Sequence, residues 1–271
     1  MRSVTSSSDS LGHYCGVSGI FSPEETNVPE TLFFTLFAQQ HRGQESAGIA
    51  YRKGDHIVAY KDLGMVSQVL RRYVGVERPS HVGIGHVRYS THGGNLLENA
   101  QPIHVTCNKG DIALAHNGNI SNTRQLKDML FDEGSIFQST SDSELILHML
   151  SRSRADGFEP ALVETLEQLE GAFSMTMTHD DSLLAIRDPW GFRPLYIGQD
   201  SEKTVVASET CALDILKIQD YRQVEPGEVV IVNSEGTRSI RFGNAPEKPR
   251  RCVFELIYFA RPDSQIFANS V

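Results

Sequence analysis

Cys15 stands at the boundary between a polar leader and an apolar segment, and this position suggests a nucleophile. Residues 1–14 (MRSVTSSSDSLGHY) are rich in serine, whereas residues 15–21 (CGVSGIF) alternate like a buried strand. If the leader is removed, Cys15 gains an α-amino group with a reference pKa of about 8. That amine can accept the thiol proton and later protonate a leaving group, so no histidine is needed. The sequence therefore predicts a propeptide followed by an N-terminal nucleophile.

Two simpler interpretations of the same stretch stay open from the residues alone. A serine-rich N-terminus is often only a disordered tail. A lone cysteine is most often an inert buried thiol, and Cys107, Cys211 and Cys252 have no setting that suggests more.

A thiol that attacks an amide also needs donors for the oxyanion that forms. Asn117 and Gly118 follow a predicted strand at residues 112–115 and offer a side-chain amide and a backbone N–H. One such donor contributes roughly 3–4 kcal/mol of transition-state stabilisation. Read alone, however, the Asn-Gly pair is a common turn.

Two charged residues could hold the two charges of an amino acid. Arg88 ends a predicted strand at residues 82–88 and could bind an α-carboxylate with both nitrogens of its fork. Asp142 could bind an α-ammonium from the first turn of a helix, for which Ser141 and Glu144 predict a capping box. Each residue alone has an ordinary structural interpretation, and their joint presence favours the functional one.

The elements that must position these residues alternate between strand pairs and helices. We expect a helix from Pro29, with Leu32, Phe33, Leu36 and Phe37 on its buried face, and a hairpin formed by residues 47–51 and 57–60. Further helices are predicted at residues 122–133 and 160–169, and strands predominate after residue 171. This order indicates an antiparallel α+β layer fold rather than a βαβ fold.

The composition of the chain indicates which binding partners and which cellular compartment to expect. The 271 residues carry a formal net charge of −9, so we expect no nucleic-acid or membrane surface as the main partner. The chain has no apolar run of 18 residues, and its leader lacks the apolar region of a secretory signal. Four cysteines without a C-x-x-C pair do not suggest a disulfide framework, and we expect a cytoplasmic protein.

Several motifs together resemble the class II glutamine amidotransferases, and within them the amidophosphoribosyltransferase family. The resemblance runs from Cys15 to the end of the chain. Besides residues 15–21, it rests on HRGQESAGIA (41–50), GIGHVRYSTHG (83–93), ENAQP (98–102), AHNGNISN (115–122), STSDSE (139–144), RDPWGFRPLYIG (187–198) and FELIYFARPDS (254–264).

The resemblance implies a four-layer αββα sandwich of the N-terminal-nucleophile hydrolase type. It also implies that Cys15 forms a γ-glutamyl thioester with glutamine and releases ammonia. The site residues that it implies are Asn117 and Gly118 at the oxyanion, Arg88 and Thr91 at the substrate carboxylate, Asp142 at its amino group, and Tyr89 and Arg42 as further pocket contacts.

Three regions follow from the same resemblance. Residues 1–14 are expected to be the leader, residues 15–243 the glutamine amidotransferase domain, and residues 244–271 a linker and the start of a truncated phosphoribosyltransferase domain. Ammonia would then react with phosphoribosyl diphosphate in the missing domain, giving 5-phosphoribosylamine in the first committed step of de novo purine biosynthesis. The full-length enzyme is expected to be a homo-oligomer.

The family also suggests cofactors for the full-length enzyme, although the glutaminase half requires none. These are Mg²⁺ and a [4Fe–4S] cluster, for which Cys252 is a candidate ligand. Two alternatives for the function stay open: the glutaminase domain of another class II amidotransferase, and a non-catalytic regulatory domain that binds glutamine.

Overall fold

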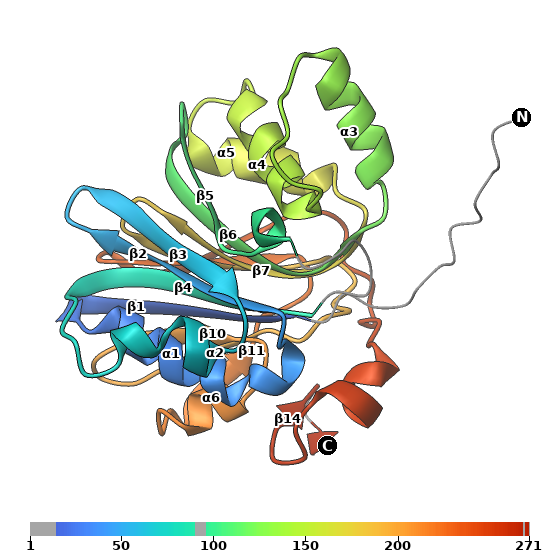
Figure 1. Cartoon of the computed structure of the whole chain (residues 1–271). Helices are drawn as coiled ribbons and strands as arrows, with labels where there is room; N and C mark the ends of the chain where they lie inside the picture. The colour runs from blue at the N-terminus through green and yellow to red at the C-terminus, as the bar shows by residue number, and fades with distance from the viewer. Residues whose placement is uncertain (1–14, 90–95, 268, 271) are drawn as a thin grey trace, which may run out of the picture.

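The fold consists of four layers, in the order helix, sheet, sheet, helix (Figure 1). The structure is a computed structural model that describes residues 15–89, 96–267 and 269–270. Its two large sheets are antiparallel and lie face to face, with helices on both outer faces. The antiparallel α+β fold is thereby confirmed, and so is the αββα sandwich that the resemblance implied.

The first sheet has seven strands and carries the predicted nucleophile at one end of a central strand, β1 (Gly16–Thr26). Strand β1 pairs with β10 on one side and with β4 on the other. Across the sheet the strands are β11 (Asp220–Gln223), β9 (Tyr196–Gln199), β10 (Thr204–Ala207), β1, β4 (Ser80–Arg88), β2 (Ser46–Lys53) and β3 (His56–Leu63).

The second sheet has six strands, and its strand β6 (Gly110–Ile120) contains both predicted oxyanion residues. Across this sheet the strands are β13 (Gly236–Arg241), β12 (Glu228–Asn233), β8 (Ser182–Arg187), β7 (Gly171–His179), β6 and β5 (Ile103–Cys107). A separate two-stranded ribbon joins β14 (Gln265–Ile266) to β15 (Asn269–Ser270).

The two sheets meet through a core of aliphatic and small side chains. Val17 and Ile84 of the first sheet belong to the same buried cluster as Ala113, Ala115 and Ala185 of the second. Burying these faces against each other removes apolar surface from water and holds the sheets in register. The ends of β1 and β6 are thus fixed relative to each other.

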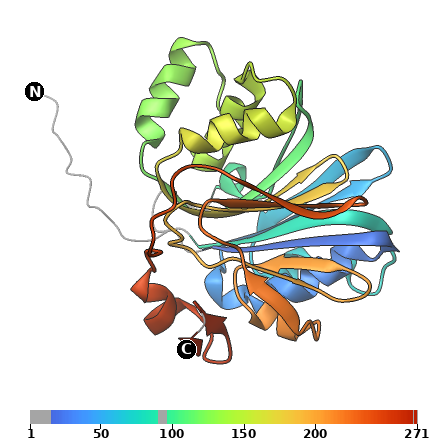
Figure 2. The same cartoon turned by 180° about the vertical axis from the view of Figure 1, so that it is seen from behind.

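Helices cover the outer faces of both sheets, as the view from behind also shows (Figure 2). On the first sheet they are α1 (Val28–Ala38), α2 (Val66–Val69) and α6 (Cys211–Asp214). On the second they are α3 (Thr123–Asp132), α4 (Asp142–Arg152) and α5 (Phe158–Glu167). Short 3₁₀ turns are η1 (Gln40–Arg42), η2 (Arg71–Tyr73) and η3 (Leu97–Asn99).

Most local predictions hold, but two that concern helices need correction. The predicted hairpin is confirmed by the pairing of β2 with β3. Helix α1 buries Leu32, Phe33 and Leu36, but Phe37 is 49% exposed and stacks on Phe33 at the edge of the helix. The core stripe of this helix is therefore narrower than predicted.

The predicted capping box of α4 is only half formed. Ser141 caps the helix, since its hydroxyl accepts from the backbone N–H of Ser143 at 3.2 Å. Glu144 does not return to the backbone of Ser141. It accepts instead from the backbone N–H groups of Gln138 and Ser139, both at 2.7 Å, and so fixes the loop before the helix.

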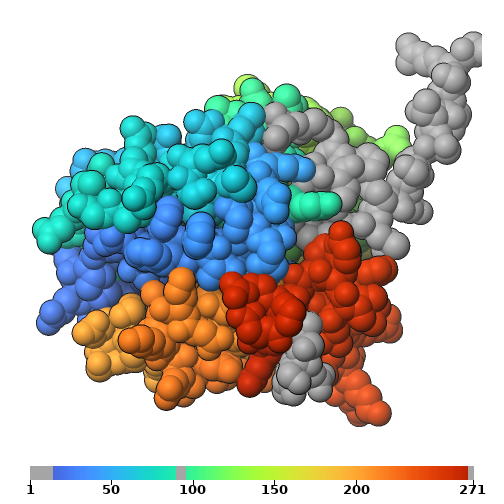
Figure 3. Space-filling model, turned by 60° about the horizontal axis from the view of Figure 1, so that its bottom comes forward, coloured from blue at the N-terminus to red at the C-terminus, as the bar shows by residue number. Residues whose placement is uncertain are grey.

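The C-terminal segment packs against the beginning of the fold. Its π-helix η4 (Glu255–Phe259) presents a fully buried Glu255, whose carboxylate accepts from Arg42 at 2.9 and 2.8 Å. Arg42 also forms an ion pair with the buried Glu209. Figure 3 shows the C-terminal segment (red) directly beside the N-terminal part (blue). The division of the chain at residue 243 stays a prediction.

The helices of the described residues were compared with the length and hydropathy that a membrane span needs. Over residues 15–89, 96–267 and 269–270, each helix is too short or too polar to span a bilayer.

The ion pairs of Glu209 make stability depend on pH. Burial alone would raise the pKa of this carboxyl, but Arg42 and His41 lower it to about 2, against a usual value of 4.5. Because the folded-state pKa is depressed, the stabilisation is fully present above pH 4.5 and is lost as the pH falls towards 2. We expect Glu209→Gln to lower the free energy of unfolding by roughly 3 kcal/mol at neutral pH.

This difference should shrink by about 1.4 kcal/mol for each pH unit below the usual pKa, as measured by urea denaturation at a series of pH values. Burial raises the pKa of Asp188 to about 6, and this changes stability with pH in the opposite direction. Because Asp188 is present in both proteins, its contribution cancels in the difference between them. The exposed Glu24→Gln is the matched control. A difference between Glu209→Gln and the parent that does not change with pH would contradict the assignment.

Candidate active site

A pocket of about 330 Å³ lies where β1 begins and β6 ends. Four of the residues predicted for the site contribute to its wall: Cys15, Arg88, Gly118 and Asp142. They come from both sheets and from the first turn of α4. The other lining residues are Asn99, Gln101, His116, Asn119, Ile120, Thr123, Thr140 and Ser141.

Cys15 is held in place on both sides of its backbone. Its N–H donates to the side-chain oxygen of Asn117 at 3.2 Å, and its carbonyl accepts from Nε of Arg42 at 3.0 Å. The residue is 5% exposed, and burial raises the pKa of the thiol to about 11, an effect that the nearby Arg88 offsets only in part. With residue 14 still attached, the thiol is therefore almost entirely protonated at neutral pH.

Strand β6 is longer than predicted, and this places the oxyanion candidates differently. The sequence suggested that the strand ends before His116, because Asn-Gly pairs are typical of turns. In the structure β6 continues to Ile120 and remains paired with β7 throughout. Asn117 and Gly118 therefore lie within a strand, where their backbone is fixed by the sheet.

The edge of β6 opposite β7 is open at Gly118. Its cross-strand neighbour Phe173 directs both its N–H and its carbonyl to Asp188, at 3.2 and 2.9 Å, so these groups do not bond Gly118. The alternation of an antiparallel ladder then points the backbone N–H of Gly118 to the other side. Strand β5 pairs only as far as Ile103 with Leu114, so this N–H faces the pocket.

No other residue fits at position 118. Its φ of 152° is one that side chains rarely adopt, and a Cβ atom there would lie 2.0 Å from the carbonyl oxygen of Ala172. Glycine thus allows the strand to stay paired while its N–H is presented to the pocket.

Asn117 supplies a second donor next to the thiol. Its oxygen is engaged by the N–H of Cys15, which fixes the orientation of the amide. Its nitrogen Nδ2 is buried and has no hydrogen-bond partner among the residues that the structure describes. A buried donor without a partner is uncommon and is well suited to a group that arrives with a substrate.

The two charged candidates lie on the wall of this same pocket. Arg88 ends β4, is 8% exposed, and has Glu45 at 3.4 Å from its guanidinium. Gly43 packs directly on its backbone, since a Cβ atom there would lie 2.6 Å from Arg88. Asp142 begins α4, and one of its oxygens accepts from the N–H of Ile120 at 3.1 Å.

The remaining predicted contacts are placed differently. Arg42 does not line the pocket but is fully buried beneath Cys15, in the cluster with Glu209 and Glu255. The backbone carbonyl of Tyr89 is 3.9 Å from the thiol sulfur, while the residue is 40% exposed. Thr91 lies outside the described residues.

Sequence reasoning assigned no role to His116 or Gln101, which both line the pocket. Gln101 accepts from the backbone N–H of His116 at 2.7 Å. The available signal in the sequence was that His116 lies in the motif AHNGNISN and Gln101 in the motif ENAQP. The contact between the two motifs, however, depends on the tertiary fold.

Cys252 lies apart from the other cysteines. Cys15 is in the pocket, Cys107 in β5 and Cys211 in α6, and all four thiols are free. Among the described residues no three His, Cys, Asp or Glu side chains are grouped so that they could hold a metal ion. These residues on their own do not fit a four-cysteine cluster, and the role of Cys252 as a ligand stays a prediction.

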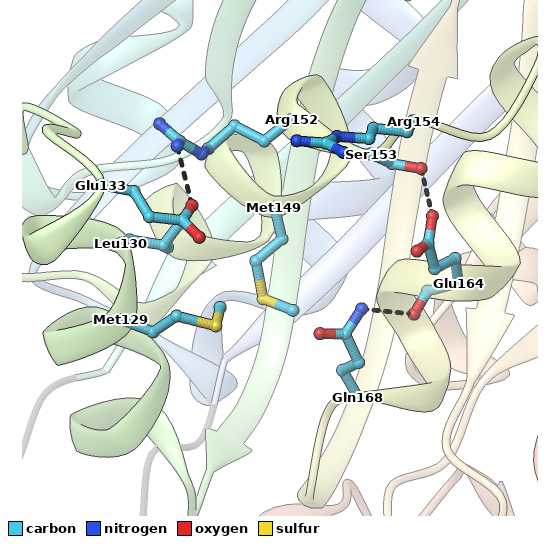
Figure 4. A pocket seen from close by; sticks show the side chains of 9 residues that line it. All are labelled: Met129, Leu130, Glu133, Met149, Arg152, Ser153, Arg154, Glu164 and Gln168. Carbon is cyan, nitrogen blue, oxygen red and sulfur yellow. Dashed lines mark hydrogen bonds and ion pairs between the residues drawn. The ribbon is translucent and has the colours of Figure 1, made fainter.

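A larger cavity of about 470 Å³ lies between α3, α4 and α5, away from Cys15 (Figure 4). Some of its polar side chains interact with one another: Arg152 binds Glu133 at 2.7 Å, and Ser153 donates to Glu164. It contains none of the predicted site residues, so size alone does not identify the functional pocket here.

Comparisons with known proteins agree with this geometry. Residues 86–214 match the family model of the glutamine amidotransferase domain, a range that includes Arg88, Asn117, Gly118 and Asp142. The chain is 42% identical over 264 residues to amidophosphoribosyltransferase 3 of Arabidopsis thaliana, covering 97% of this chain and 49% of the relative. It is 41% identical to amidophosphoribosyltransferase of Methanocaldococcus jannaschii, covering 95% of this chain and 58% of that protein.

Solved structures give the same relationship. The glutamine phosphoribosylpyrophosphate amidotransferase of B. subtilis, complexed with ADP and GMP, superposes with a TM-score of 0.85 at 41% identity, covering 94% of this chain and 55% of that one. The chain thus spans about half the length of the relatives that it matches. Its residues 86–214 are thus similar to the glutamine amidotransferase domain, its fold is that of the N-terminal-nucleophile hydrolases, and it is similar over nearly its whole length to the amidophosphoribosyltransferases.

Proposed function

We propose that this chain hydrolyses the side-chain amide of glutamine, with Cys15 as the nucleophile after removal of residues 1–14. The observation that carries the proposal is the convergence in one place of a thiol, two unengaged amide donors and two opposite charges. Cys15, the N–H of Gly118, Arg88 and Asp142 line the pocket, and Asn117 lies directly behind Cys15. A binding site for an uncharged molecule would not require this set of groups.

The chemistry follows from these positions. Cleavage of the Tyr14–Cys15 bond frees an α-amine, which takes the proton of the thiol. The thiolate attacks the amide carbon, and the oxyanion of the tetrahedral intermediate accepts from Nδ2 of Asn117 and the N–H of Gly118. The intermediate collapses to a γ-glutamyl thioester as the α-ammonium protonates the amide nitrogen, which leaves as ammonia. Water then hydrolyses the thioester to glutamate and restores the thiol.

The charges at the rim select an amino acid. Arg88 presents a planar fork suited to an α-carboxylate, and Asp142 presents an anion suited to an α-ammonium. The predicted contacts of Thr91 and Tyr89 with the substrate belong to the same proposal. For Arg42, by contrast, burial supports a role beneath Cys15 rather than the predicted contact with the substrate.

The use of the ammonia is proposed from the relatives. They are amidophosphoribosyltransferases, and one similar solved structure is that of an allosteric regulatory enzyme of purine biosynthesis. We propose that ammonia is transferred to phosphoribosyl diphosphate, giving 5-phosphoribosylamine, in a longer homo-oligomeric protein whose other half uses Mg²⁺. We also propose a cytoplasmic location, because the four cysteines do not suggest a disulfide framework and the leader lacks the apolar region of a secretory signal.

The raised pKa of Cys15 supports one alternative. A thiol whose pKa is about 11 is a poor nucleophile at neutral pH as long as residue 14 is attached. If the Tyr14–Cys15 bond is never cleaved, the same pocket would bind glutamine without turning it over, as a regulatory domain. The state of the N-terminus distinguishes the two functions.

We expect Cys15→Ala to abolish the release of ammonia from glutamine, with a loss of at least about 10³-fold in kcat, because no other group can form the thioester. The measurement is ammonia and glutamate production, together with the intact mass of each protein. The parent should have lost residues 1–14, and the variant should retain them.

Cys107→Ala is the matched control, because this cysteine lies in β5 outside the pocket and should leave the rate unchanged. Ammonia release by Cys15→Ala at the parental rate would exclude Cys15 as the nucleophile. An intact leader in an inactive but glutamine-binding parent would favour the regulatory function.

Arg88→Lys should weaken substrate binding more than it slows the chemistry. Lysine keeps the charge but loses the bidentate fork, so we expect KM for glutamine to rise by about ten- to a hundredfold with a much smaller change in kcat. Steady-state kinetics provide the measurement. Arg124→Lys, an exposed substitution on α3, is the control, and an unchanged KM for Arg88→Lys would remove Arg88 from the substrate site.

A further inference from the structure

His116 is held more firmly than any residue beside it on the open edge of β6. Its backbone N–H donates to the side-chain oxygen of Gln101 at 2.7 Å, and its carbonyl accepts from Nε2 of His86 at 3.1 Å. These partners replace the strand that is missing on this side. The imidazole itself is 1% exposed and points to the beginning of α4.

The imidazole lies beside the carboxylate of Asp142. Its Nδ1 is 3.4 Å from one oxygen of Asp142 and 3.3 Å from the hydroxyl of Ser143. The other oxygen of Asp142 accepts from the N–H of Ile120. Since a carboxylate only accepts, the favourable tautomer carries its proton on Nδ1. Strand β6 thus holds Asp142 through residues 116 and 120, on either side of Gly118.

The far nitrogen of the ring adds no contact of its own. Its Nε2 is buried, and no hydrogen-bond partner for it exists among the described residues. The polar contacts of the imidazole are therefore those that Nδ1 makes at the beginning of α4.

We propose that His116 is a positioning residue that fixes the Asp142 carboxylate for the α-ammonium of the substrate. This inference rests on the proposed function and extends it. Because Gly118 lies on the same strand, the ammonium site and the oxyanion donor share one support. Strand β6 therefore helps to set the distance between the amino end and the amide end of a bound glutamine.

The test compares His116→Ala with His116→Asn, since the amide nitrogen of asparagine falls near the position of Nδ1. We expect His116→Ala to raise KM for glutamine about tenfold, with kcat changed less than threefold, and His116→Asn to restore KM to within about threefold of the parent. His148→Ala, on the same helix as Asp142 but outside the pocket, is the control. A parental KM in His116→Ala, or no rescue by asparagine, would overturn the proposal.

Two further measurements separate positioning from a merely structural effect. In an Asp142→Asn background, His116→Ala should have less than a twofold further effect, whereas independent action would make the two losses multiply. Turnover of glutaramate, which is glutamine without its α-amino group, should be equally fast in the parent and in His116→Ala. A loss with glutaramate equal to that with glutamine would overturn the proposal.

The role of His116 can also be tested by measuring glutamine binding in the absence of turnover. Calorimetric titration of glutamine into Cys15→Ala and into Cys15→Ala with His116→Ala should show a tenfold loss of affinity for the second. If the parent releases no ammonia but this loss appears, the proposed catalysis fails and the role of His116 stands. If both proteins bind glutamine equally, the role of His116 fails while catalysis by Cys15 can stand. If His116→Ala does not fold, His116→Gln replaces it, because its amide nitrogen falls near Nε2 instead.

Discussion

The organisation of the site depends on one constraint: β6 extends beyond its neighbour β5 while remaining inside the protein. Backbone N–H and carbonyl groups along such an edge must find partners, because leaving them buried and unpaired is costly. Side chains from three other elements meet this need, with Gln101 and His86 at residue 116 and Asp142 at residue 120. The N–H of Gly118, between them, faces the pocket. The same requirement that stabilises the strand thus creates a place for an incoming oxygen.

The proposed nucleophile depends on the other sheet. Cys15 precedes the central strand β1, and contacts with Asn117 and Arg42 fix its backbone on both sides. The stacking of the two sheets brings this strand end against β6, so the thiol and the proposed oxyanion donors belong to different layers. Small shifts between the sheets would separate them. The dense core between the layers, rather than any loop, therefore provides the accuracy that the chemistry requires.

Much of this could be read from the sequence, where local pattern and chemistry agree. The change in composition at Cys15, the β2–β3 hairpin and the capping of α4 by Ser141 all have local causes. What could not be predicted depends on tertiary contacts. Asn-Gly normally indicates a turn, and only the pairing of β6 with β7 shows that the strand continues. Nor does the sequence reveal that Arg42 is buried between two carboxylates, one of them more than 200 residues away in the chain.

That distant carboxylate has a consequence for dividing the protein into parts. Glu255 is fully buried, although Val253, Ile257 and Tyr258 around it are exposed. It contacts two guanidinium groups, those of Arg42 and Arg193, and Arg42 supports the backbone of Cys15. A fragment that ends at residue 243 would keep every residue of the pocket and lose this counter-ion. The balance of buried charge beneath Cys15 therefore depends on a residue beyond residue 243, the boundary that the resemblance suggests.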